Sequence, residues 1–497
     1  MTISAAGSTA ALLSQRLIDM RSQFDDLQRQ LSTGQKSDTY AGLGLDRGLS
    51  VSLNALSAAL GSYNTTIDNV MTRLNVAQNA LTAVGKVSSN LGSALSQGAD
   101  SPNNGNTTQV SAKSWLQQLV GLLNTKVGDR YVFSGSATDR PSTATYDQMI
   151  NGDGAKAGLT QLISERNQAD LGASGLGRLT VTNASATSVQ IAEDSATSPF
   201  GFKLNAISSN LSNATMSGPS GSPSAETVSF AGVPSAGENV TFTFDLPDGT
   251  TSNLTLTATT DSPPGANQFT IGGTAAATAT NLQTALTTAL GTRANTTLKA
   301  ASTVQASNEF FDGDSSNPPQ RVNGPPYDTA TSLVVGTSAN TVIWYTGDTS
   351  GTARGSATAR VDQSLTVNYG TRANETGIRN VVQSAATRAA VTVSSTDPNG
   401  PNFTSALDNR LSGHIDGSGG VQTVTDIEAE LAGVQTSMQS IKANHQQTGN
   451  TLGAFLDQIS GVSKVQVGTE LLSLQTRMQA SMQTTALLFQ TSLVKYL

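Results

Sequence analysis

A seven-residue repeat of apolar positions runs through residues 49–95 and constrains the fold more than any other feature of this sequence. Successive members are separated alternately by four and three residues, with one polar lapse at Ser88. Such a strict repeat specifies a helix that packs along a continuous seam and supercoils with a left hand. At 1.5 Å per residue this helix is roughly 70 Å long, which exceeds an ordinary globular domain.

The same spacing recurs at both ends of the chain. A first helix carries Leu13, Leu17, Met20, Phe24, Leu27 and Leu31. A further segment, 116–127, follows a turn-rich stretch at 97–108, and we expect it to form an antiparallel hairpin with the long helix. The repeat returns over 427–462, so the two long helices are predicted to pair. Their predicted seam consists of Leu56, Leu60, Ile67, Leu74, Leu81, Ile427, Leu431, Val434, Met438, Ile441, Leu452 and Phe455.

The last helix has a more polar seam. Together with the six residues of the first helix, the predicted self-assembly residues are Leu471, Leu474, Met478, Met482, Phe489, Leu493, Tyr496 and Leu497. A chain end rarely buries enough surface to offset its ordering entropy, so an amphipathic terminus indicates packing against something. The segment 13–31 is one such partner.

The middle of the chain, about 178–367, is rich in Thr, Ser, Gly and Pro. Alternating runs at 239–246, 252–259 and 340–347 predict strands, and LPDG at 246–249 predicts a hairpin turn. Residues 278–290 predict a short helix inside this β-rich part. We therefore expect an α+β fold, in which an antiparallel coiled-coil rod built from both termini carries a central β-rich insert.

Three regions follow from this order. Residues 1–35 and 463–497 are expected to form terminal helices. Residues 36–177 and 366–462 are expected to form the helical rod with a small β-hairpin region, and 178–365 the exposed insert.

Composition excludes several functions. Only 13% of residues are charged and the net charge is −7, so no basic surface is available for nucleic acid. The chain has no cysteine, which excludes disulfides and thiolate ligands. The N-terminal stretch lacks a basic region followed by an apolar core, so we expect no cleaved signal peptide. No run reaches the ~18 apolar residues that membrane insertion requires.

No residue pattern predicts catalysis, a cofactor or a metal. His445 lies on a helix seam and His414 in a glycine-rich turn, and neither has a partner at triad or ligand spacing. The aspartates of FFDGDSSN (310–317) lack the glutamate that closes a calcium loop. GLGLDRG (42–48) lacks the Lys-Ser/Thr ending of a phosphate loop, so we interpret it as a flexible link between helices.

The terminal helices favour an assembly over an isolated coiled-coil dimer. Breaks at 32–44 and 460–468 separate them from the long helices, and they are short and poor in charge. Such a pair is marginal alone and gains stability when neighbouring copies bury it. Head-to-tail contact between identical subunits gives an open helical filament when the rotation does not close.

Several segments resemble the bacterial flagellin family, which includes the hook–filament junction protein. RQLSTGQKSDTYA (29–41) is similar to the stretch that follows the family's first helix. VGDRYVFSGSATDRPS (127–142) resembles a segment typical of the junction protein and of some flagellins. VNYGTRANETGIRNVV (367–382) resembles the return from the insert to the rod, and SLVKYL (492–497) the family's ending. One departure concerns Lys464 and Gln466, which stand where the family has acidic residues, although Glu470 matches.

The resemblance implies a structural, non-enzymatic subunit that polymerises with itself into the extracellular flagellar filament for motility. It also implies type III export without a cleaved signal peptide, an export chaperone, and contacts with hook-associated and cap proteins. The terminal helices would form the inner core of the polymer. Two alternatives stay open at this point, namely the hook–filament junction protein and a secreted adhesin whose insert binds glycan or calcium.

Overall fold

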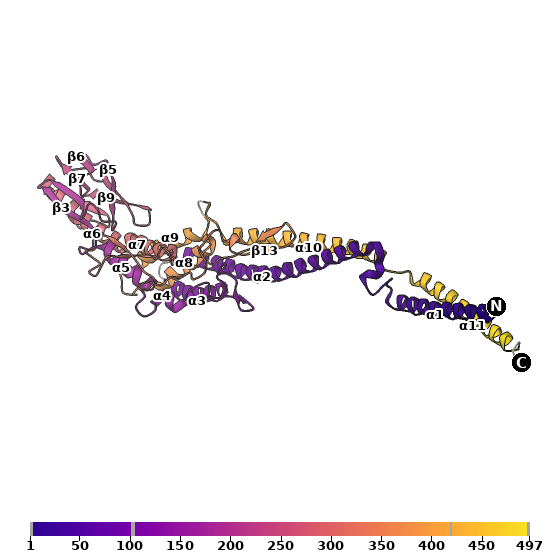
Figure 1. Ribbon diagram of the computed structural model, residues 1–497. Helices are drawn as coiled ribbons and strands as arrows, with labels where there is room; N and C mark the ends of the chain where they lie inside the picture. The colour runs from indigo at the N-terminus through magenta and orange to yellow at the C-terminus, as the bar shows by residue number, and fades with distance from the viewer. Residues whose placement is uncertain (1–2, 101–104, 418–419, 495–497) are drawn as a thin grey trace. The chain divides into compact units, whose positions relative to one another are not determined.

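The computed structural model describes residues 3–100, 105–417 and 420–494 and divides the chain into two compact units. Unit 1 comprises residues 1–70, 359–367 and 436–497, and unit 2 comprises residues 71–358 and 368–435. Helices and strands are both present in several groups (Figure 1), so the predicted α+β class is confirmed. The predicted region boundaries stay a prediction.

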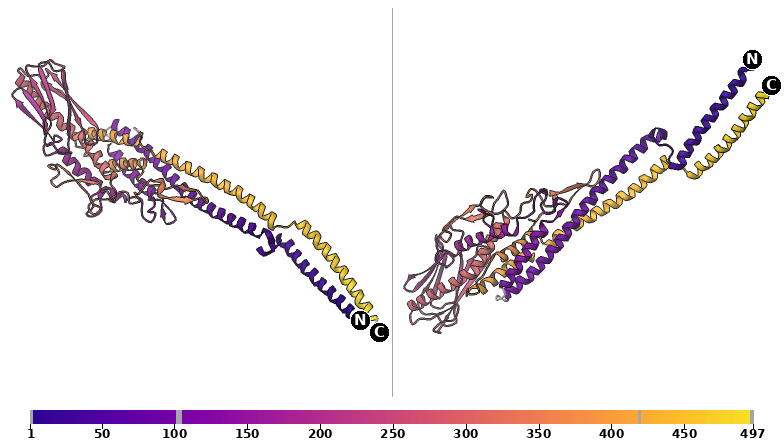
Figure 2. Two further views of the ribbon diagram at one scale, coloured as in Figure 1. Left: turned by 45° about the horizontal axis from the view of Figure 1, so that its top comes forward. Right: turned by 90° about the horizontal axis from the view of Figure 1, so that it is seen from below.

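Unit 1 is helical. It contains α1 (Ile3–Thr33), the 3₁₀-helix η1 (Tyr40–Asp46), the first part of α2 (Arg47–Asp100), the last part of α10 (Val424–Ser460) and α11 (Lys464–Val494). Figure 2 shows α1 beside α11 in both views, and the two helices are in contact. The predicted flexible link at 42–48 is wrong in part, because residues 40–46 form η1 and Gly44 makes its turn with a φ of 60°.

Unit 2 contains a group of shorter helices that periodicity did not delimit. Their bounds are α3 (Gly105–Leu123), α4 (Tyr146–Asn151), α5 (Leu159–Leu171), α8 (Thr376–Ala390) and α9 (Gly400–Ile415). α3 packs on α8, and α8 packs on α9. The predicted turn at 97–108 corresponds to the end of α2 at Asp100 and the start of α3 at Gly105, with 101–104 outside the described residues.

Two four-stranded sheets make up most of the insert. One has the order β3-β4-β7-β6 and the other β10-β9-β8-β5, in which β10 alone runs parallel to its neighbour. The strands are β3 (Leu179–Ser185), β4 (Ser188–Glu193), β5 (Lys203–Ser209), β6 (Ala214–Ser220), β7 (Ala225–Phe230), β8 (Asn239–Asp245), β9 (Thr251–Thr259) and β10 (Gln268–Thr270). The predicted hairpin is confirmed: β8 pairs antiparallel with β9, and Leu246 N donates to Thr250 O at 2.8 Å across the turn.

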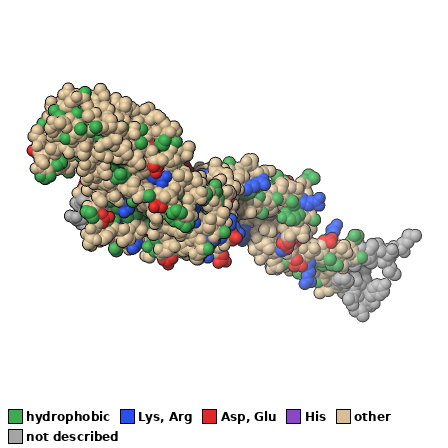
Figure 3. Space-filling view, turned by 90° about the vertical axis from the view of Figure 1, so that its left-hand side faces the viewer, with side chains coloured by type: hydrophobic (Ala, Val, Ile, Leu, Met, Phe, Trp, Pro, Cys, Tyr) green, Lys and Arg blue, Asp and Glu red, His purple; other side chains and the backbone are tan. Residues whose placement is uncertain are grey.

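Alternation places the apolar side chains of both sheets in one core. Val240, Phe242 and Phe244 of β8 are buried between half-buried polar neighbours. The core is shared with α6 (Ala275–Arg293) through Leu282 and Leu286. The face drawn in Figure 3 carries few charged side chains over the strands.

The central helix is much longer than the predicted 278–290. α6 continues through a π-helical turn, η3 (Ala294–Leu298), into α7 (Lys299–Asp312). Leu298 and Ala301 extend its buried face beyond the predicted end. The prediction of a short helix was therefore wrong. The residues after 290 are rich in Thr and include Asn, so their intrinsic helix propensity is low, and tertiary packing stabilises the helix there instead.

Short strand pairs complete the fold. They are β1 (Lys126–Val127) with β2 (Arg130–Tyr131), β11 (Gln320–Val322) with β12 (Leu333–Val335), and β13 (Thr358–Arg360) with β14 (Thr366–Asn368); a 3₁₀ turn, η4, spans Arg354–Ser356. The predicted strand at 340–347 is wrong. Thr341 and Tyr345 form only isolated bridges there, and adjacent Trp344 and Tyr345 are both buried, which breaks the alternation.

Glu226 is an acidic residue inside the insert, and we predict that it makes the stability of the protein pH-dependent. It lies on β7, is fully buried, and neither carboxyl oxygen has a hydrogen-bond partner among the described residues. Burial raises the pKa of Glu226 from 4.5 to about 7. Because the unfolded chain releases this proton more readily, the free energy of unfolding falls as pH rises between these values, by about 2–3 kcal/mol.

Urea unfolding at pH 5 and pH 8 of the natural chain and of Glu226→Gln measures this effect. The variant is expected to lose less stability between the two pH values, since its amide does not ionise. Equal pH dependence in both proteins would show that Glu226 is not the cause.

Candidate self-assembly surface

The terminal helices α1 and α11 meet along one continuous apolar stripe. On α1 the half-buried positions of this stripe are the six predicted ones, Leu13, Leu17, Met20, Phe24, Leu27 and Leu31. On α11 the matching buried or half-buried positions are Val467, Leu471, Leu474, Met478, Ser481 and Thr485. Both series keep the four–three spacing, so the two helices form a short antiparallel coiled coil within unit 1.

The phase of the α11 stripe differs from the predicted one. Leu471, Leu474 and Met478 lie on it, but Met482 is 49% exposed and Ser481 takes the inward position. Val467, which was not predicted, is 4% exposed. The side chains of Phe489, Leu493, Tyr496 and Leu497 lie outside the described residues, so their predicted role stays a prediction.

A backbone contact fixes the register of the pair at its inner end. Lys36 N donates to Ser460 O at 2.8 Å, and Val462 N donates to Gly34 O at 3.0 Å. The Lys36 ammonium also donates to Ile459 O at 2.8 Å. Gly34 has a φ of +74°, a conformation that favours glycine. The LSTGQK stretch therefore joins the link between α1 and α2 to the link between α10 and α11.

The outward faces of the same two helices carry uncovered apolar side chains. Exposed large hydrophobic residues on them are Leu12, Ile18, Val465, Leu472, Met482 and Leu487, with exposed fractions from 49% to 81%. Lone exposed apolar residues are normal, but several on a pair of thin helices mark an interaction surface. We refer to these six residues as the outer apolar face.

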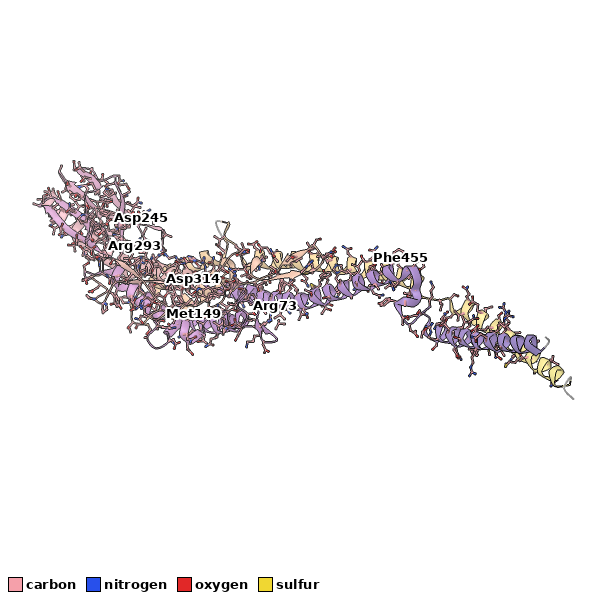
Figure 4. All side chains as sticks on the ribbon, viewed as in Figure 1. Arg73, Met149, Asp245, Arg293, Asp314 and Phe455 are labelled. Carbon is pink, nitrogen blue, oxygen red and sulfur yellow. The ribbon has the colours of Figure 1, made fainter. Side chains whose placement is uncertain are left out.

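A second group of exposed apolar residues surrounds the break between α1 and α2. Leu45 is fully exposed and Leu49 is 52% exposed. Leu56 and Phe455 were predicted in the seam of the long helices, yet they are 44% and 51% exposed (Phe455 is labelled in Figure 4). They lie close to the ends of their helices, where nothing among the described residues covers them.

The remaining predicted seam residues of α2 and α10 are buried or half-buried. In unit 1 Leu60 and Ile67 are buried on α2, and Leu452 on α10. In unit 2 the buried seam residues are Leu74, Leu81, Ile427 and Leu431. Met438 of unit 1 is also buried, while Val434 and Ile441 are half-buried.

Polar contacts beside this seam show that the helices are antiparallel. In unit 1 Lys442 pairs with Asp68, and His445 Nδ1 lies 3.1 Å from Asn64 Oδ1. In unit 2 Gln435 donates to Asn75 at 2.9 Å, and Thr82 donates to Glu428 at 2.9 Å. As the residue number rises on α2 it falls by the same amount on α10, so the predicted pairing of the two heptad segments is confirmed.

The two histidines lie in different surroundings. His445 is 5% exposed on the α10 seam, and its Nε2 lies 3.5 Å from a carboxyl oxygen of Asp362. His414 is near the end of α9, and burial lowers its pKa. In FFDGDSSN the carboxylates do not converge: Asp312 pairs with Arg379 at 2.6 Å, while Asp314 accepts the backbone N–H groups of Ser316 and Asn317.

The described residues contain no group of three or more His, Asp or Glu side chains placed to hold a metal ion. None of the described helices is long and apolar enough to cross a membrane.

The two motif segments on either side of the insert pair with each other in unit 2. Gly135 N donates to Thr371 O at 3.1 Å, and Ala373 N donates to Phe133 O at 2.9 Å. The buried Thr371 hydroxyl donates to Val132 O at 2.7 Å. The FSGSATDRP and NYGTRANETG stretches are therefore one structural element that joins the start of the insert to its end.

Charged side chains form further contacts within the same element. Arg372 pairs with Asp348 at 3.2 Å, and Ser136 donates to Asp348 at 2.7 Å. Burial acts to raise the pKa of Asp348, but hydrogen bonds from Ser350 and Ser136 and the Arg372 charge outweigh it and lower the pKa to about 2. Sequence reasoning did not find this cluster, because its members come from distant segments with no spacing in common.

Removing the Thr371 hydroxyl should weaken this element measurably. Thr371→Val keeps the side-chain shape but leaves the buried Val132 carbonyl without its donor, which costs about 1–2 kcal/mol. Urea unfolding followed by the tryptophan fluorescence of unit 2, which holds both Trp115 and Trp344, measures the loss. Thr358→Val, at an exposed position with no hydrogen bond from its hydroxyl among the described residues, is the control. Equal midpoints for both variants would contradict the assigned role.

Comparison with known proteins identifies the N-terminal part of the chain. Residues 7–138 match the family profile described as the bacterial flagellin N-terminal helical region. The matched range includes most of α1, all of η1, α2 and α3, and the start of the FSGSATDRP stretch. No curated protein matches the chain.

The match and the α+β fold with helical termini support a flagellin-type structural role. Residues 7–138 are thus similar to the N-terminal helical region of the bacterial flagellin family. Flagellins as a family polymerise with themselves into the extracellular flagellar filament.

Proposed function

We propose that this chain is a subunit of the flagellar filament and polymerises through its terminal helices. The observation that carries this proposal is the two-faced character of the α1–α11 pair. One face of each helix is used inside the subunit, while the residues of the outer apolar face are 49–81% exposed in the described part of the chain. Stacked copies would bury that face without competing for the internal stripe.

The proposed arrangement assigns each predicted region a place in the polymer. Residues 1–35 and 463–497 form its inner core, the rod segments 36–177 and 366–462 surround that core, and the insert 178–365 faces solvent. Uncharged polar side chains on the strands suit a solvent-facing role. Export as an unfolded chain, an export chaperone, and contacts with hook-associated and cap proteins belong to the same proposal.

The hook–filament junction protein is the second candidate, and the FSGSATDRP stretch favours it. Seeded growth separates the two. Purified chain added to short flagellar fragments and imaged by electron microscopy should yield long fibres if the chain builds the filament. Growth that stops after a few subunit layers would assign the junction role instead, and no addition to the seeds would exclude both.

A further inference from the structure

A groove of about 820 Å³ runs along α6 in the insert, and the flagellar role does not use it. One wall is the exposed side of α6 with the following π turn, η3, and the other is the loop before β10. Asn402 of α9 also lines the groove. The volume falls within the range of small-ligand sites, and π turns inside helices are frequent at functional sites.

Threonines spaced one turn apart line the helical wall. Those in the groove are Thr284, Thr288, Thr292 and Thr296. Each hydroxyl donates to the carbonyl four residues earlier, at distances of 2.8–3.2 Å. Because each hydroxyl proton is used in a hydrogen bond within the helix, the threonine hydroxyl oxygens offer only lone pairs to a ligand. The wall is therefore a row of hydrogen-bond acceptors that suits a ligand rich in hydroxyl groups.

The side-chain amide of Gln268 supplies complementary donors from the opposite wall. Gln268 accepts the Gly265 N–H at 3.0 Å through its amide oxygen, so its NH₂ group keeps two donors. Asn281 donates to Thr270 O at 2.8 Å and keeps its amide oxygen as an acceptor. Gln268 is the first residue of β10 and follows Asn267, whose φ is +53°.

Arg293 is the one charged residue among those lining the groove. It lies at the end of α6 (Figure 4) and has no ion pair among the described residues. A basic residue near the C-terminus of a helix often interacts with the backbone carbonyl groups that lack a partner there. Here the helix continues through η3 into α7, so Arg293 is not at such an end. The guanidinium is therefore available for an anionic group of a ligand, and no lining carboxylate opposes it.

We propose that this groove binds an acidic oligosaccharide, with the threonine row taking sugar hydroxyls and Arg293 a carboxylate. A nucleic acid fits poorly, because one cation and no aromatic side chain line the groove. Because no aromatic side chain among the lining residues can stack on a sugar ring, we expect weak binding, with a dissociation constant on the order of 1 mM per site. The proposal does not depend on polymerisation, since the groove is complete in one chain.

Saturation-transfer NMR on the full-length monomeric chain tests the proposal, with trigalacturonate as the acidic probe and cellotriose as the neutral one. Transfer is expected for trigalacturonate and much less for cellotriose. Arg293→Gln should weaken binding by roughly ten-fold and Thr288→Val by roughly three-fold, while Arg293→Lys retains most of it.

Two matched controls separate the groove from general effects. Thr280→Val removes a hydroxyl of the same helical row outside the groove, and Arg130→Gln removes an exposed cation elsewhere. Both should bind as the natural chain does. No transfer from trigalacturonate at 10-fold the expected dissociation constant, equal binding of cellotriose, or unchanged binding by Arg293→Gln would each overturn the proposal.

Discussion

Replacing Leu472 by glutamate is expected to abolish fibre growth while leaving the free chain folded. Leu472 is 64% exposed on α11, away from the stripe that meets α1, so the monomer loses no internal contact. In the proposed polymer the same position is covered by a neighbouring copy. Burying an unpaired carboxylate there costs several kcal/mol per contact, and about 4 kcal/mol raises the critical concentration roughly a thousand-fold.

Sedimentation after seeding measures the critical concentration, and circular dichroism checks that the variant is folded. Val335→Glu is the matched control, because Val335 is 68% exposed on β12 of unit 2 and receives the same substitution. The control should polymerise as the natural chain does. Growth of Leu472→Glu at the natural critical concentration would show that the outer apolar face is not an assembly surface.

The second large effect is expected at a buried ion pair in unit 2. Arg388 of α8 and Asp408 of α9 are 2% and 0% exposed, with Nε and Oδ1 separated by 2.8 Å. Burial raises the pKa of Asp408 to about 6, although the Arg388 charge acts against this rise. Arg388→Met leaves a buried carboxylate without its cation, which is expected to lower the free energy of unfolding by about 3–5 kcal/mol.

Urea unfolding at pH 8 measures this loss, and Arg130→Met at an exposed position is the control. Below pH 6 the penalty should shrink, because the unpaired Asp408 is then protonated and neutral. The double variant Arg388→Met/Asp408→Leu should recover much of the stability, since both charges are gone. A single variant as stable as the natural chain, or a double variant as unstable as the single one, would contradict this account.

Periodicity predicted the long helices and their pairing because a seven-residue repeat leaves few other ways to bury the same face. Leu60, Ile67, Leu431 and Met438 lie where the repeat places them. The β8–β9 hairpin was equally predictable, because alternation and the LPDG turn agree locally. Where several local signals agree, the sequence alone was sufficient to predict the structural element.

Prediction was weaker where one segment offers two similar apolar faces. On α11, Leu471, Leu472, Leu474, Met478 and Met482 support more than one helical phase, and only the contact with α1 selects one of them. The role of Glu226 could not be found from sequence, since an acidic residue in an alternating strand is expected on the solvent side. Arg372 and Asp348 were missed because their contact depends on the pairing of distant segments.

Hydrogen exchange of the backbone amides in α1 and α11 tests the central claim most directly. The claim is that this helix pair has a complete apolar environment only when neighbouring copies supply it. In dilute monomer these amides are expected to exchange orders of magnitude faster than those of Ile67 or Leu431 in the long helices, and to become protected in seeded fibres. Strong protection in the dilute monomer, unchanged on polymerisation, would contradict it.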